Sequence, residues 1–127
     1  MKALTICQPY AHLIAIGEKR VENRTWPTRY RGPLLIHAGK SRDWLVDEDE
    51  ADMIFGAFVA TAQLIDCIHF DDIISCLHDY ESYPWLSEHK HASGPWCWVL
   101  ADVVALPEPV PARGAQGLWD MKWRAMS

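Results

Sequence analysis

The segment IGEKRVENRTW, residues 16–26, carries five charged residues between apolar ends. Lys19, Glu22 and Arg24 are the ones whose types and spacing suggest chemistry. Two cations close together can bind a phosphate group. A lysine beside a carboxylate can instead transfer a proton. A third interpretation is structural, because charges that are partly buried are normally found in pairs. The segment by itself leaves all three open.

These side chains must be positioned by a strand, which the pattern predicts over residues 19–26. Side chains alternate along a strand, so Glu22, Arg24 and Trp26 are expected to share one face. Lys19 stands at the start of this strand, where alternation does not fix its direction. The expected arrangement is a small charge network with an indole ring beside it.

The rest of the chain predicts strands and short helices in the order β-α-β-β-(α)-β-α-β-β. Apolar residues at helical spacing, preceded by a proline and followed by a glycine, predict a short helix near 9–16. Two long apolar runs predict buried strands at 57–65 and 97–105. Prolines and glycines predict an irregular connection over 107–117, and a closing strand follows near 118–123.

The predicted fold class is α+β, because strands outnumber helices and no regular βαβ alternation occurs. A small, strongly curved mixed sheet or barrel with short flanking helices fits this order. The 127 residues, half of them apolar, are expected to form one domain over 1–127.

The charge is unevenly placed along the chain. A net charge of −5 by itself argues against a nucleic-acid partner. Residues 1–42, however, hold eight Lys and Arg against two acidic residues, a local charge of +6. A local basic surface can bind phosphates within an acidic protein, because charges farther than ~10 Å away are screened at ordinary salt.

Cysteine and histidine spacing favours neither disulfides nor a metal site. None of the four cysteines forms a CxxC pair, so reduced thiols are expected. His89 and His91 form an HxH motif, but no second ligand pair at zinc spacing accompanies it. We therefore expect no metal and no cofactor. No signal peptide is recognised and no apolar run approaches the ~20 residues of a membrane span, so a cytoplasmic protein without a membrane partner is expected.

Seven tryptophans are many for a chain of this length. A core position is the simpler interpretation of each one taken alone. Exposed aromatic rings beside basic residues are nevertheless what single-stranded nucleic acids stack on, at ~1–3 kcal/mol for each base.

The segment GEKRVENRTW resembles the GxKxxExRxW signature of the ASCH domain family, a branch of the PUA-like folds. QPYAHLI at 8–14, YRGPLLIHAGK at 30–40 and RGAQGLW at 113–119 resemble further segments of the family in the same order. The resemblance thus covers nearly the whole chain. It implies a small mixed β-barrel with short flanking helices, a cleft lined by the signature residues, and binding of RNA or another nucleic acid.

Carried over by position, the resemblance implies that Lys19, Glu22 and Arg24 line this cleft and that Gln8-Pro9-Tyr10 forms one wall. One enzymatic branch, the bacterial N4-acetylcytidine amidohydrolases, has the same spacing of lysine and arginine. That branch has a threonine nucleophile where this chain has Glu22, which argues against the same reaction here. Other family members act as nucleases, so hydrolysis of RNA stays open.

Three functions from different classes follow. The first is a module that binds RNA or a modified nucleotide. The second is an RNA-directed hydrolase in which Lys19 and Glu22 transfer protons. The third is a protein-interaction adaptor that uses the acidic segment 43–52. The residues expected to contact a nucleic acid are Gln8, Tyr10, Lys19, Arg24, Trp26 and Arg31.

Overall fold

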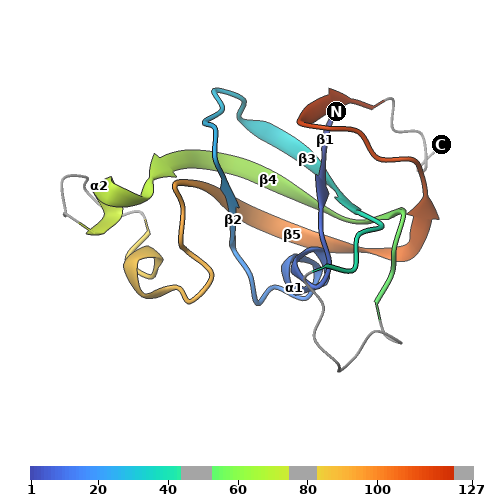
Figure 1. Ribbon diagram of the computed structural model, residues 1–127, viewed down its shortest axis with the longest axis horizontal. Coiled ribbons are helices and arrows are strands. Elements are labelled where there is room, and N and C mark those ends of the chain that lie inside the picture. Colours follow the sequence, from blue (N-terminus) through green and yellow to red (C-terminus); the bar gives the residue numbers. More distant parts are fainter. Residues whose placement is uncertain (44–52, 75–82, 122–127) are drawn as a thin grey trace.

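The computed structural model describes residues 1–43, 53–74 and 83–121, which form a curled sheet with short helices (Figure 1). The sheet has six strands in the order β2-β5-β4-β3-β1-β6. β1 and β3 run parallel, and the other neighbouring strands run antiparallel. The predicted α+β class, with a strongly curved mixed sheet, is confirmed.

The order of elements agrees with the sequence pattern wherever the chain is described. The strands are β1 (Lys2–Ile6), β2 (Val21–Arg24), β3 (Gly32–Ala38), β4 (Ala57–His69), β5 (Trp96–Pro111) and β6 (Leu118–Asp120). The helices are α1 (Tyr10–Ala15), α2 (Phe70–Ile74) and the single-turn 3-10 helix η3 (Leu86–Glu88). Residues 44–52 of the acidic segment, and with them most of the expected adaptor surface, lie outside the described residues.

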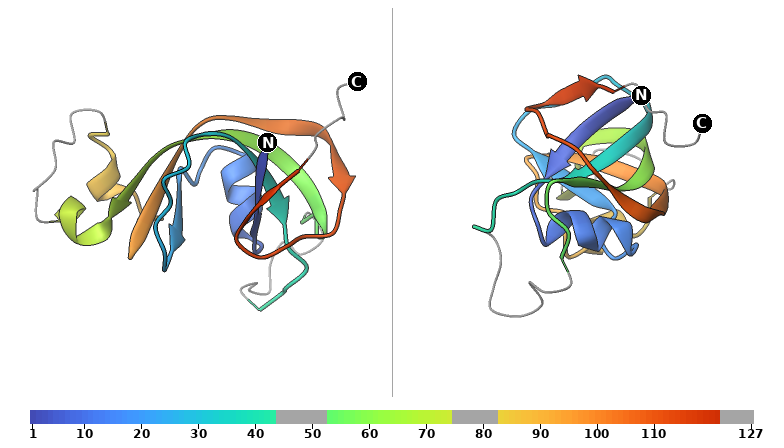
Figure 2. Two further views of the ribbon diagram at one scale, coloured as in Figure 1. Left: turned by 90° about the horizontal axis from the view of Figure 1, so that it is seen from above. Right: turned by 90° about the vertical axis from the view of Figure 1, so that its right-hand side faces the viewer.

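Bulges between β4 and β5 give the sheet its curvature. Their register shifts at three places, one of them between Thr61 and Gln63. Opposite this shift, Asp102 has a φ of 51°, in the left-handed region. A bulge bends the strand and increases its twist. The two long strands therefore curve, and α1 lies in the hollow that they form (Figure 2).

β5 corrects two expectations. The predicted buried strand at 97–105 is buried only over its first residues, and from Ala101 onward its side chains are half-buried or exposed. The proline-rich residues after 106, expected to be irregular, continue the strand to Pro111. β2 pairs with β5 along Trp96–Val99, so the later part lies at an edge of the described sheet. An edge tolerates proline because the missing N–H has no strand partner there.

The helix expected near 9–16 is α1, and it begins and ends close to the predicted bounds. Gly17, with a φ of 87°, stands just after it, as the sequence pattern indicates. Ala11 and Ile14 are fully buried and pack against the main apolar core, which includes Trp98. α1 thus closes the hollow of the sheet with an apolar face.

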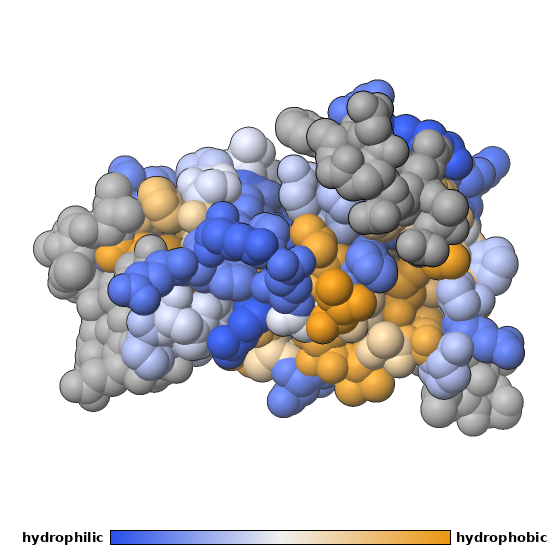
Figure 3. Space-filling view, turned by 90° about the horizontal axis from the view of Figure 1, so that it is seen from below, coloured by the Kyte–Doolittle hydropathy of each residue, from blue (hydrophilic) through white to orange (hydrophobic). Residues whose placement is uncertain are grey.

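The surface seen from below divides into a mainly hydrophilic part and a part where hydrophobic residues gather (Figure 3). Among the described residues, Ile16, directly after α1, is 60% exposed. Within the described parts of the chain, no helix is long and apolar enough to cross a bilayer.

Candidate functional site

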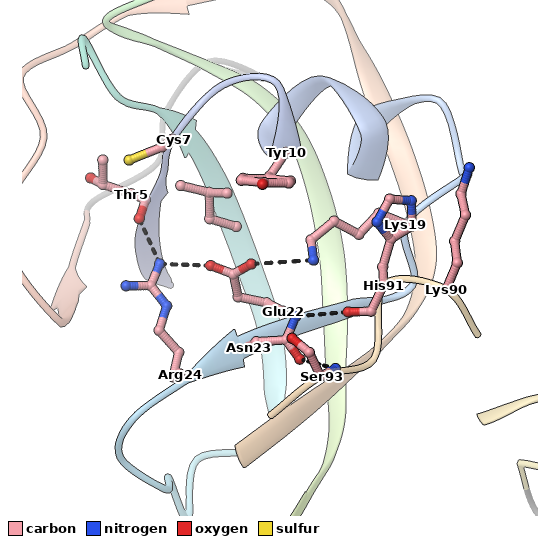
Figure 4. Close-up of a pocket in the computed structure, with 11 residues that line it drawn as sticks. Thr5, Cys7, Tyr10, Lys19, Glu22, Asn23, Arg24, Lys90, His91 and Ser93 are labelled. Atoms are coloured by element: carbon pink, nitrogen blue, oxygen red, sulfur yellow. Dashed lines mark hydrogen bonds and ion pairs between the residues drawn. The ribbon is translucent and has the colours of Figure 1, made fainter. Parts of the chain in front are cut away.

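A pocket of about 520 Å³ lies between β1, the start of α1, β2 and the loop that precedes β5 (Figure 4). This volume is within the range of small-molecule sites, roughly 300–1,000 Å³. The lining residues are Thr5, Ile6, Cys7, Tyr10, Lys19, Glu22, Asn23, Arg24, Lys90, His91 and Ser93.

β2 places Glu22 and Arg24 on one face, as alternation predicts. Arg24 Nη2 lies 2.9 Å from Glu22 Oε2 and also donates a hydrogen bond of 2.7 Å to the backbone oxygen of Thr5. Thr5 belongs to β1, which three strands separate from β2 in the sheet order. The arginine therefore joins the two sides of the curled sheet across the pocket.

Lys19 enters the pocket from the turn before β2 and is only 3% exposed. Its backbone N–H donates to the oxygen of Leu13, at 3.0 Å, so α1 holds this turn in place. The Lys19 Nζ lies 3.8 Å from Glu22 Oε1 and 5.3 Å from the centre of the Tyr10 ring. Burial lowers the pKa of the amine, Glu22 opposes this shift, and Arg24 adds to it.

Glu22 lies between the two cations and is 7% exposed. Burial raises the pKa of its carboxyl group, whereas Arg24 and Lys19 act in the opposite direction. Two cations and one carboxylate together give the three side chains an excess of positive charge when all are ionised. Such an arrangement favours an anionic or electron-rich ligand.

Asn23 fixes the opposite wall of the pocket. Its Nδ2 donates to the backbone oxygen of His91 at 2.7 Å. Its Oδ1 accepts hydrogen bonds from the backbone N–H groups of Ser93, at 3.0 Å, and Gly94, at 2.8 Å. One side chain thereby ties the loop before β5 to β2, although the bonded residues are about 70 positions apart in the sequence.

Two buried side-chain nitrogen atoms in the described chain have no hydrogen-bond partner, namely Arg24 Nε and His91 Nε2. Both residues line the pocket. Burial, and then the nearby Lys19 and Lys90, lower the pKa of His91, so its ring is mainly neutral at pH 7. Buried polar atoms are nearly always paired, and an exception calls for a ligand, a water molecule or a functional role.

The comparison with known families agrees with this architecture. Residues 4–109 match the model of the ASCH domain. This chain belongs to the ASCH domain family. Its curled sheet with short helices is the PUA-like fold of that family, which is generally linked to RNA binding.

Two curated proteins are similar to this ASCH domain. Activating signal cointegrator 1 of Homo sapiens is 27% identical over 128 residues, and that of Mus musculus is 26% identical over 128 residues. Each alignment covers 93% of this chain and 22% of the relative. The chain thus spans about a fifth of the length of the curated relatives that it matches.

The structure brings together the three charged residues of the ASCH signature and Tyr10, and it places the other predicted contact residues elsewhere. Gln8 is buried and does not line the pocket; it donates to the oxygen of Ile54 at 2.7 Å and accepts from the N–H of His12 at 2.8 Å. Both ends of its amide are therefore occupied, one by the backbone of α1 and the other by the segment before β4.

Trp26 and Arg31 also lie outside the pocket lining. Trp26 follows the end of β2 and packs edge-on against Trp98, with ring centres 4.7 Å apart. Trp26 was expected to share the face of Glu22 and Arg24, but β2 ends at Arg24, so strand alternation does not reach it. Arg31 lies 3.6 Å from a carboxylate oxygen of Asp66.

The lining residues that the sequence did not predict are Thr5, Ile6, Cys7, Asn23, Lys90, His91 and Ser93. The HxH motif drew attention to His91, but as a metal ligand. Within the described residues, no group of three or more His, Cys, Asp or Glu side chains could hold a metal ion. The sequence alone gave no reason to place this loop at the pocket, because the loop comes close to β2 only through the pairing of β2 with β5.

Proposed function

We propose that this ASCH domain binds single-stranded RNA by holding one nucleotide in the pocket. Lys19 and Arg24 bind a phosphate group or a base edge, and the Tyr10 ring offers a stacking surface. His91 supplies a further hydrogen-bonding group from the opposite wall.

The observation that carries this proposal is the pair of unpartnered buried atoms, Arg24 Nε and His91 Nε2. Both belong to a pocket of nucleotide size whose lining also holds Lys19 and Lys90. A ligand with several hydrogen-bonding oxygens or nitrogens would satisfy such atoms. The aromatic ring beside these cations suits a base better than a simple anion.

The test is fluorescence anisotropy with a labelled single-stranded RNA at several salt concentrations. Roughly three phosphate contacts would give a slope of log K against log salt near −2. Lys19→Ala and Arg24→Ala should each weaken binding, whereas Arg29→Ala, an exposed arginine outside the lining, should not. Binding that does not depend on salt would show that phosphate is not the group recognised. If both pocket variants unfold instead, the charge network is structural.

A second candidate function is hydrolysis of RNA, with Lys19 as the general base. It is favoured because Glu22 lies closer to Arg24, at 2.9 Å, than to Lys19, at 3.8 Å. Burial also lowers the pKa of the Lys19 amine, as a general base requires. Incubation with RNA and with acylated nucleosides tests this function by product formation. Turnover should fall at least about a hundredfold in Lys19→Ala, which is a typical loss for a proton-transfer group.

A further inference from the structure

A second group of aromatic and basic side chains lies beside the pocket but outside its lining. It consists of Arg20, Trp85 and His89 and is called the Arg20 platform below. The guanidinium carbon of Arg20 lies 3.8 Å from the centre of the Trp85 ring, as in a stacked pair. The His89 ring stands edge-on to the same indole, with ring centres 5.3 Å apart. The Arg20 guanidinium and the Trp85 indole thus form a cationic stacked pair, with the His89 ring at its edge.

The platform is built in advance of any ligand. The backbone N–H of Arg20 donates to His89 Nε2 at 3.0 Å, and the backbone oxygen of Arg20 accepts from the N–H of Leu100 at 2.9 Å. Trp85 packs against an apolar cluster that includes Val21. The backbone at Arg20 and the indole beneath its side chain are therefore held before binding, which reduces the ordering that a ligand must impose.

The platform is also accessible. Arg20 is exposed, while Trp85 and His89 are half-buried. A guanidinium group stacked on an indole presents a flat, cationic surface, and unpaired nucleobases stack on arginine planes and aromatic rings. A base in a duplex could not reach such a surface, because it is already stacked and paired.

The platform adjoins the pocket through two short connections. Lys19 and Arg20 are consecutive, and the first is buried in the pocket while the second is exposed. On the opposite wall, His89 of the platform and His91 of the pocket have ring centres 5.5 Å apart. Lys90 stands between these histidines in the sequence and lines the rim of the pocket (Figure 4).

We infer that the Arg20 platform stacks the nucleobase next to the one in the pocket, so that the domain takes two consecutive nucleotides of a single strand. The phosphate that joins these nucleotides would pass Lys90. This inference rests on the proposed function, because it assigns a neighbouring subsite to the same strand.

The experiment measures competition against a labelled single-stranded RNA by four unlabelled compounds. These are adenosine monophosphate, the dinucleotide ApA, and two versions of the dinucleotide in which one or the other base is absent. Wild type should bind ApA about tenfold more tightly than adenosine monophosphate. Tenfold corresponds to about 1.4 kcal/mol, which is within the range for one stacked base.

Variants at Arg20 then locate the second base. Arg20→Ala should bind ApA about tenfold more weakly than wild type. Its affinity for adenosine monophosphate should be unchanged. Its affinity should also be unchanged for the dinucleotide that lacks the base expected to stack on the platform. Arg20→Lys keeps the charge but not the plane, so it should lose most of the preference for ApA and keep the salt slope. Arg29→Ala removes an exposed arginine elsewhere and should resemble wild type.

The outcomes separate the two proposals. Wild-type affinity for ApA in both Arg20 variants, together with lost binding in Lys19→Ala, would overturn the platform and leave the pocket in place. An equal loss for ApA and adenosine monophosphate in Arg20→Ala would also overturn it, because the effect would then be one of general charge. Absence of RNA binding by the wild type would overturn the proposed function itself.

Discussion

The Glu22 carboxylate binds the Arg24 guanidinium at 2.9 Å, and both side chains project from the same face of β2. The carboxylate restrains the arginine, but it also cancels part of the positive charge that a phosphate would meet. Its second oxygen is 3.8 Å from Lys19 Nζ, so one acid lies between both cations. The protonation state of Glu22 therefore decides how much of the positive charge of Lys19 and Arg24 is cancelled.

Glu22→Gln is expected to leave RNA binding equal or tighter. The amide oxygen can still accept a hydrogen bond from Arg24, while the negative charge is removed from the pocket. Anisotropy titrations should also show a steeper dependence on salt than in wild type. Glu108→Gln removes an exposed acid on β5 and serves as the control. A loss of affinity in Glu22→Gln alone would mean that the carboxylate itself contacts the ligand.

Lys19 is expected to make RNA binding sensitive to alkaline pH. Burial lowers the pKa of its amine below the ordinary value of 10.5, so the charge is lost at a lower pH than in an exposed lysine. Affinity should fall as pH rises through that lowered pKa. In Lys19→Arg the fall should disappear, because arginine stays charged over the same range. A fall of the same size in Lys19→Arg would assign the titration to another group.

The same shift has a consequence for stability. Between its lowered pKa in the folded state and 10.5, Lys19 binds fewer protons in the folded than in the unfolded protein. Stability relative to Lys19→Met should therefore rise with pH across this window. At pH values below this window Lys19 is charged in the folded protein, so burial of its charge lowers stability by the full amount. Urea denaturation of both proteins at several pH values measures this difference.

Asn23→Ala is expected to release the loop before β5. The substitution removes the hydrogen bonds to the backbone of His91, Ser93 and Gly94. Leaving such groups unpaired costs about 1–3 kcal/mol, which urea denaturation would detect. Amide hydrogen exchange at Ser93 and Gly94 should accelerate, and affinity for RNA should fall because the loop carries part of the pocket. Unchanged exchange at these two amides would contradict this role.

The extent to which the site could be predicted follows from how local each contact is. Glu22 and Arg24 are two positions apart in one strand, so alternation alone places them together. The direction of Lys19 depends on a hydrogen bond from its backbone to Leu13, which no strand pattern contains. For Trp26 the strand pattern predicted too much, because β2 ends at Arg24 and alternation no longer applies two residues later.

The loop wall of the pocket was beyond prediction for a different reason. His91 and Asn23 are 68 positions apart, and they meet only because β2 pairs with β5. Similarly, the prolines at the end of β5 predicted an irregular segment. Prolines in the interior of a strand are tolerated mainly at an edge, and the sequence does not show which strands lie at an edge before their pairing is known. The curved sheet, in contrast, follows from the order of strands and short helices along the chain.

His91 is expected to make RNA binding sensitive to acid pH. Burial, with Lys19 and Lys90, lowers the pKa of its imidazole below 6.5, and Glu18 opposes this shift. The neighbouring His89 is shifted in the same direction, first by burial and then by His91. Acidification should therefore protonate both imidazole rings, at a pH below 6.5. This places new positive charge beside the RNA.

Affinity for single-stranded RNA should rise about tenfold as pH falls through this range. A hydrogen bond to a charged group contributes about 1.5 kcal/mol, which corresponds to roughly tenfold in affinity. His91→Gln should remove most of this rise, whereas the backbone oxygen of residue 91 still accepts the bond from Asn23. His69→Gln, which changes a histidine outside the pocket lining, is the control.

Stability should move in the opposite direction to affinity. Between the lowered pKa and 6.5, His91 binds fewer protons in the folded state, so stability is lost as pH falls through this window. RNA that binds the charged ring more tightly should offset this loss. The melting temperature should therefore fall with acidification in the free protein and fall less with RNA present. An equal fall with and without RNA would show that His91 does not face the ligand.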